Sequence, residues 1–88
     1  PPEVDSVMEL IESELVVFDM QLASAEPIQY GKRLKIQAAH LWAEINIFYG
    51  KKGYSVVRTP KSGSNEDLGK LATQIIEEVL FTYTNNEG

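Results

Sequence analysis

Few residues in this sequence have the type and spacing that catalysis needs. His40 is the only histidine and there is no cysteine, so the motifs support neither a nucleophilic triad nor a zinc site with sulfur ligands. Glu44 lies four residues after His40, but two ligands alone make a weak metal site. Glu77 and Glu78 are adjacent, and adjacent helical positions point about 100° apart, which prevents a facing acid–base pair. We therefore expect no enzymatic activity, no cofactor and no bound metal.

The segment 63–70 has the glycine and lysine of a phosphate-binding loop without the spacing of that loop. Five residues separate Gly63 from Gly69, where the motif has four. Leu71 stands where the motif has the hydroxyl residue that holds magnesium. We expect this segment to begin a helix rather than to bind phosphate.

The charges of the chain are segregated along the sequence. Residues 1–26 contain seven acidic and no basic residues, and residues 66–88 contain five acidic residues and one lysine. Residues 27–65 contain seven basic residues and one acidic residue. If the middle of the chain forms one structural layer, its exposed face is basic although the net charge is −5.

Aromatic residues lie among these basic residues. Basic strands with exposed rings bind single-stranded nucleic acid in many small folds, through phosphate neutralisation and base stacking. The alternative is that the lysines keep the turns soluble while the rings pack in the core. Acidic helices would repel a polyanion unless they lie wholly on the far face, so the alternative is favoured. The candidate binding residues are Trp42, Phe48, Tyr49, Lys51, Lys52, Tyr54 and Arg58.

Trp42 is the only tryptophan, and in a strand it would share a face with Phe48, opposite Leu41 and Ile45. A helix or a partner would then cover that face, and aromatic anchors are enriched in protein interfaces. The leading hypothesis is a non-catalytic protein-interaction or assembly module, self-associating or a subunit of a larger complex. The alternative hypothesis is a nucleic-acid-binding domain that uses the basic central strands and the turn at residues 50–53.

Periodicity in the first part of the chain predicts a helix and then a strand. Apolar residues recur at helical spacing and predict an amphipathic helix from about residue 3 to 13. From Leu15 to Ala23 apolar and polar residues alternate, which predicts a half-buried strand. Ser24 to Pro27 then predicts a break.

Residues 28–49 fit either of two structures. The apolar residues alternate, with a change of phase that predicts a strand with a bulge at Ala38-Ala39. Many of the same residues also fit one helical face. The β-branched and aromatic residues of 45–49 favour the strand, because they lead into a turn at 50–53 and a returning strand at 54–57.

The last part of the chain predicts a long helix from about residue 65 to 81, capped by Ser64 or Asn65. Residues 82–88 are expected to form a frayed tail. The predicted fold is therefore α+β: an N-terminal helix, a small antiparallel sheet of three to four strands, and a long C-terminal helix packed on one sheet face.

Length and composition indicate one small domain over residues 1–88. Apolar residues make up 43% and charged residues 24%, an ordinary globular mixture. The apolar runs are far shorter than the roughly 20 residues of a membrane span, and the acidic first segment differs from a targeting peptide. We expect an intracellular protein without membrane contact. The start at Pro1 without methionine is compatible with a domain excised from a longer chain.

Overall fold

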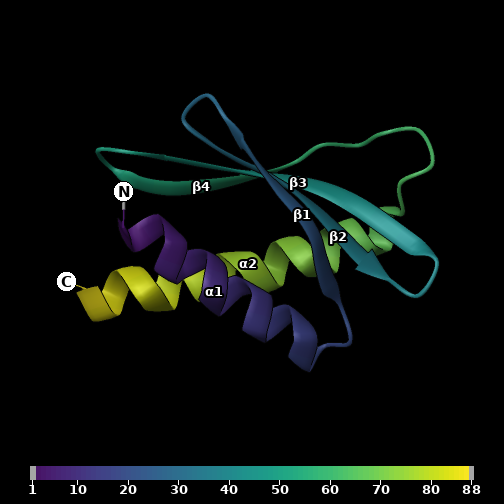
Figure 1. Ribbon diagram of the computed structural model, residues 1–88, viewed down its shortest axis with the longest axis horizontal. Coiled ribbons are helices and arrows are strands. Elements are labelled where there is room, and N and C mark those ends of the chain that lie inside the picture. The colour runs from purple at the N-terminus through teal and green to yellow at the C-terminus, as the bar shows by residue number, and fades with distance from the viewer. Residues whose placement is uncertain (1, 88) are drawn as a thin grey trace.

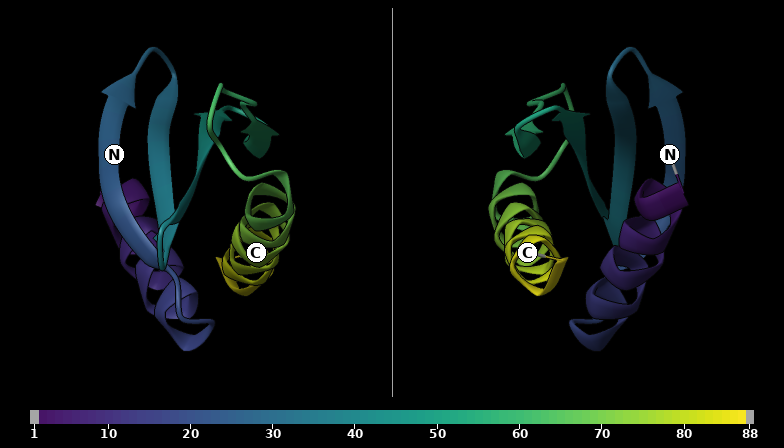
Figure 2. Two further views of the ribbon diagram at one scale, coloured as in Figure 1. Left: turned by 90° about the vertical axis from the view of Figure 1, so that its right-hand side faces the viewer. Right: turned by 90° about the vertical axis from the view of Figure 1, so that its left-hand side faces the viewer.

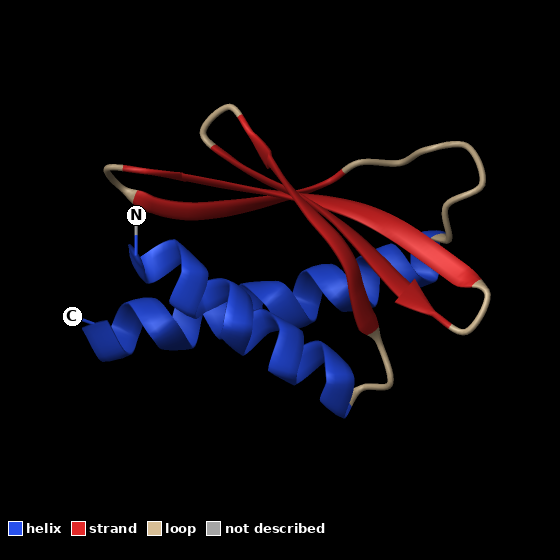
Figure 3. Cartoon of the chain, in the orientation of Figure 1, coloured by secondary structure: helices blue, strands red, loops and turns tan. Residues whose placement is uncertain are grey.

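Two helices and one four-stranded sheet make up the chain. The computed structural model describes the backbone of residues 2–87 and the side chains of residues 4–83. The strands form one antiparallel sheet in the order β1-β2-β3-β4, and both helices lie on the same side of it (Figure 1, Figure 3). The predicted α+β fold is confirmed, with four strands. In chain order the elements are α1 (Pro2–Val17), β1 (Gln21–Ile28), β2 (Gly31–Ala38), β3 (Leu41–Gly50), β4 (Gly53–Arg58) and α2 (Glu66–Glu87).

The hydrophobic core lies between the sheet and the helices. Every second side chain along β3 is buried, at Ala43, Ile45 and Ile47, and β2 contributes Leu34 and Ile36. Helix α2 packs against β3 and β4, while α1 packs against α2 and β1. Since side chains alternate along a strand, the remaining positions of the sheet point away from both helices. The buried residues from the helices include Val7, Ile11, Leu15, Leu68, Ala72, Ile76 and Leu80.

Helix α1 is longer than predicted, and the strand predicted over 15–23 is wrong in its first part. Leu15 is fully buried because it continues the helical stripe. The helix ends where Asp19 takes a left-handed conformation, with φ 60°. The N–H of Asp19 donates to the carbonyl of Val16 and the N–H of Met20 to that of Leu15, as in a Schellman motif. The alternation in the sequence therefore spans a helix end and a strand start.

The break predicted over Ser24 to Pro27 is also wrong, because this segment belongs to β1. Pro27 pairs with Lys32 of β2, and a register shift lies between Leu22 and Ser24. As an edge strand, β1 can hold a proline without losing a ladder hydrogen bond to a second neighbour.

Residues 31–49 are extended, as favoured, but they form two strands rather than one bulged strand. Ala38 pairs with Leu41 across a two-residue turn, in which Ala39 has φ 53°. A hairpin puts these paired residues on one face at a spacing of three, which reproduces the change of phase that predicted a bulge. The second hairpin, with Gly50 opposite Gly53, lies at the predicted turn.

Helix α2 is capped by a side chain at its start, and packing on the core extends it at its C-terminal end. The Oδ1 atom of Asn65 accepts a hydrogen bond of 2.9 Å from the N–H of Leu68, so Asn65 is the N-cap. The helix runs on through residues 82–87, for which the sequence predicted a tail. Tyr83 is partly buried against the core, three and four positions after Leu80 and Val79, and so extends the apolar stripe.

Candidate nucleic-acid interface

The face of the sheet that points away from the helices carries the candidate site. In Figure 2 both helices follow one side of the twisted sheet, and no helix of residues 2–87 lies on the other. We call this surface the open sheet face. Its side chains occupy alternate, paired positions on the four strands. They are Ser24 and Glu26 of β1, Arg33, Lys35 and Gln37 of β2, Trp42, Glu44, Asn46 and Phe48 of β3, and Ser55 and Val57 of β4.

Glu44 organises the basic residues of this face. Its Oε2 atom lies 3.8 Å from Nε of Arg33 and 3.5 Å from Nζ of Lys61, in the loop between β4 and α2. The Glu44 side chain is only 13% exposed, whereas those of Arg33 and Lys61 are 43% and 49% exposed. Glu26 makes a further ion pair with Arg33, at 3.4 Å. The two bases are therefore held in place and still present donors to solvent.

Trp42 lies beside a third base and beneath the β4–α2 loop. Nζ of Lys35 lies 5.0 Å from the centroid of the Trp42 ring, a cation–π contact. Two backbone hydrogen bonds fasten the loop to β3: Thr59 N–H donates to the Glu44 carbonyl, and Asn65 N–H to the Trp42 carbonyl. Gly63, in the left-handed region at φ 85°, brings the loop close to the indole ring.

Two polar atoms of the open sheet face have no hydrogen-bond partner among the described residues. They are Oδ1 of Asn46 and Nε of Arg33, and both are buried atoms. Arg33 and Asn46 are direct cross-strand partners in the β2–β3 ladder. Buried polar groups are normally hydrogen-bonded. Both atoms are buried and Nε of Arg33 already faces Oε2 of Glu44 at 3.8 Å, so a ligand on the face would meet the exposed parts of these side chains and not these two atoms.

The residues proposed from the sequence are divided between two sides of the sheet. Trp42 and Phe48 lie on the open sheet face. Tyr49 and Tyr54 pair across β3 and β4 on the helical side, with ring centroids 6.3 Å apart and an edge-on geometry. Their place on that side follows from the alternation along β3.

The basic candidates lie at the margins of the sheet. Lys51 and Lys52 form the exposed tip of the β3–β4 hairpin. Arg58 pairs with Ile45 on the helical side and reaches Gly69 of α2, since a Cβ added to that glycine would lie 3.8 Å from the Arg58 Cδ atom. Arg58 is therefore placed at the junction of sheet and helix, away from Trp42.

The candidate binding residues named from the sequence do not include Arg33, Lys35, Asn46 or Lys61, although the three bases belong to the basic segment 27–65. The signal for Arg33 and Lys35 is present, because they alternate with the buried residues of β2. The place of Lys61 on this face could not be read from the sequence, since it depends on how the β4–α2 loop returns over β3.

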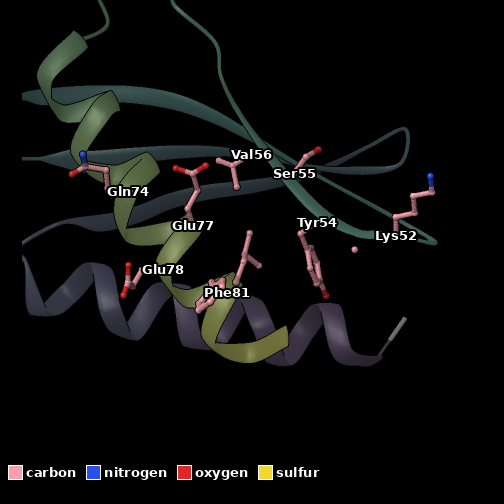
Figure 4. Close-up of a pocket in the computed structure, with 10 residues that line it drawn as sticks. Lys52, Tyr54, Ser55, Val56, Gln74, Glu77, Glu78 and Phe81 are labelled. Carbon is pink, nitrogen blue, oxygen red and sulfur yellow. The ribbon is translucent and has the colours of Figure 1, made fainter. Parts of the chain in front are cut away.

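A groove between β4 and the second half of α2 contains two carboxylates but does not have the geometry of a catalytic site. It has a volume of about 790 Å³, and Tyr54, Gln74, Glu77 and Glu78 line it. Figure 4 shows Glu77 and Glu78 pointing away from each other, with Lys52 at the far end beyond Tyr54. The two carboxyl groups do not converge on one point, as an acid–base pair would have to do.

Protein-family models, curated proteins and solved structures were compared with the chain, and none matches it. No three His, Asp or Glu side chains of the described residues gather where they could hold a metal ion. Neither helix in the part of the chain that the structure describes is long and apolar enough to cross a membrane.

Proposed function

We propose that the chain is a non-catalytic nucleic-acid-binding domain whose contact surface is the open sheet face. The separation of charge between the two layers is the observation that carries this proposal. All seven basic residues of segment 27–65 belong to the strands or to the loops beside them. The carboxylates of α1 and α2 belong to the other layer (Figure 3). A polyanion on the open sheet face thus meets three of these bases, Arg33, Lys35 and Lys61, and lies away from the acidic helices, which answers the objection that the net charge is negative.

The face supplies the two kinds of contact that nucleic-acid binding uses. Arg33, Lys35 and Lys61 can donate to phosphate oxygens, because each is partly or largely exposed. Trp42 and Phe48 are partly exposed on the neighbouring strand and can stack on bases. Stacking needs unpaired bases, so the proposed ligand is a single strand.

The carboxylates of the face limit its affinity. Glu44 and Glu26 offset part of the charge of the three bases while they hold Arg33 and Lys61 in position. Three phosphate contacts correspond to a slope of about −2 in a plot of log affinity against log salt concentration for a single strand. We therefore expect moderate affinity that falls as the salt concentration rises.

The intrinsic fluorescence of Trp42 provides a direct test, because the chain has no other tryptophan. Single-stranded oligonucleotides of mixed sequence would be titrated into the protein between about 50 and 200 mM salt. The expected result is saturable quenching with a salt slope near −2, and weaker binding of the matching duplex. Unchanged emission, together with no binding up to about 100 μM at the lowest salt concentration, would contradict the proposal.

Binding of a protein partner is a second candidate function, located on the opposite side. The observation that favours it is apolar exposure in the helical layer, where Leu10, Phe18 and Leu71 line one groove and are each exposed by more than two-fifths. Apolar side chains gathered in this way mark binding sites more often than scattered ones do. A polar substitution at Leu71 should remove partner binding and leave the free energy of unfolding nearly unchanged.

A further inference from the structure

The groove between α1 and α2 is lined mostly by apolar and aromatic side chains, several of them exposed. It has a volume of about 710 Å³. Leu10 and Glu14 of α1 line one side together with Phe18. Leu71, Ile75 and Val79 of α2 line the other side. Leu10, Phe18 and Leu71 are 48%, 49% and 43% exposed. The residues on α2 recur every four positions, so they form a continuous ridge along that helix.

The charge around this groove has a single sign. Glu14 and Glu78 are part of its lining, one from each helix. Segment 1–26, which includes α1, contains no basic residue, and Lys70 is the only basic residue of α2. Lys70 is placed beside Glu66, with an Nζ to Oε1 distance of 3.5 Å. An occupant of the groove therefore meets apolar walls between carboxylates.

We propose that this groove binds an amphipathic helix of another protein, with apolar residues on one face and Lys or Arg on both flanks. Two neighbouring helices with a groove between them accept a third helix by packing ridges into grooves. From Leu71 to Tyr83 the wall of α2 is about 18 Å long, which corresponds to three helical turns. Basic flanks would match Glu14 and Glu78. The inference rests on the second candidate function and is independent of nucleic-acid binding.

Charge also argues against two other occupants of the groove, a second copy of the chain and a membrane surface. A second copy of the chain docked by the same face would bring the carboxylates of both copies together. An anionic membrane surface would be repelled by the same carboxylates. A basic amphipathic helix is the occupant that satisfies both the apolar walls and the acidic rim.

The test is a selection from a displayed library of random 16-residue peptides against the intact chain. The expected result is enrichment of peptides with Leu, Ile or Phe at i, i+3 or i+4, and i+7, flanked by Lys or Arg. Changing both Leu10 and Leu71 to serine should weaken the selected peptides at least tenfold, as expected for anchors in a binding groove. The matched control is Val57→Ser on the open sheet face, where Val57 is 47% exposed, and it should leave peptide affinity unchanged.

Charge variants test whether the partner is basic, separately from whether the groove binds a protein at all. Glu14→Lys with Glu78→Lys should weaken the basic peptides severalfold, whereas Glu66→Lys outside the groove should not. Enrichment of acidic or uncharged peptides that still require Leu71 would overturn the inference and leave protein binding as a function. No enrichment, a dimer that the double serine variant dissociates, or binding to lipid vesicles in place of peptides would overturn both.

Discussion

Lys35 holds its ammonium group 5.0 Å from the ring centroid of Trp42 on a sheet face that no described helix covers. The two residues come from neighbouring strands, β2 and β3, and lie on one face because each is out of phase with the buried residues of its strand. At an exposed site a cation–π contact contributes only about 0.5 to 1 kcal/mol. The ammonium group of Lys35 can therefore leave the Trp42 ring and bind a phosphate at a small cost in free energy. The indole ring is then free to stack on a base.

Removing the ring should weaken nucleic-acid binding without unfolding the domain. Base–aromatic stacking is worth roughly 1 to 3 kcal/mol per base, so Trp42→Ala should reduce affinity by about fivefold to 150-fold. Anisotropy of a labelled oligonucleotide measures this, since the variant has no tryptophan. Phe81→Ala is the matched control, because Phe81 is 68% exposed in the helical layer. Equal effects of the two substitutions would show that the open sheet face is not the contact surface.

The apolar stripe of α2 should dominate stability. Ile76 is fully buried, so Ile76→Ala should lower the free energy of unfolding by about 2 to 4 kcal/mol in chemical denaturation. Leu71→Ala, on the same helix but at a position 43% exposed, should cost clearly less. Similar losses at the two sites would mean that the stripe is not the core.

Gly31 should tolerate no side chain, although its φ is not left-handed. A Cβ at this position would lie 1.9 Å from the carbonyl oxygen of Ile47 in the neighbouring strand. Gly31→Ala should force β2 and β3 apart and cost roughly 1 to 3 kcal/mol, the range of overpacked sites. Gly50→Ala is the control, because an added Cβ there meets nothing within 4 Å. A Gly31→Ala variant as stable as the control would refute the β2–β3 register.

Several parts of the fold can be predicted from the sequence because the signal is local. The stripe of α2 repeats over four turns, and the glycines of residues 50 and 53 mark the second hairpin. The strand predicted over 15–23 was wrong in its first part because the stretch around Asp19 alternates like a strand, although it is the C-terminal end of a helix. The hairpin at Ala39 and His40 was hidden because neither residue is a usual turn former.

The candidate site needed information that is not local. The charge segregation along the chain is visible in the sequence, but its meaning depends on which face of the sheet the helices cover. Arg33 and Lys35 become a surface only because both helices pack on the opposite face. Lys61 joins them through Glu44, in a contact that depends on the path of the β4–α2 loop.

A pair of charge reversals on opposite layers tests the central claim most directly. Lys35→Glu places the change on the open sheet face, and Lys70→Glu makes the same change on helix α2, so the two variants have the same net charge. Oligonucleotide affinity would be measured for both as a function of salt concentration. We predict that Lys35→Glu weakens binding about tenfold, since a charged hydrogen bond contributes roughly 1.5 kcal/mol, and that it reduces the salt slope by about 0.7. Lys70→Glu should change neither. Equal losses in the two variants would show that only net charge matters and would contradict a binding site on the open sheet face.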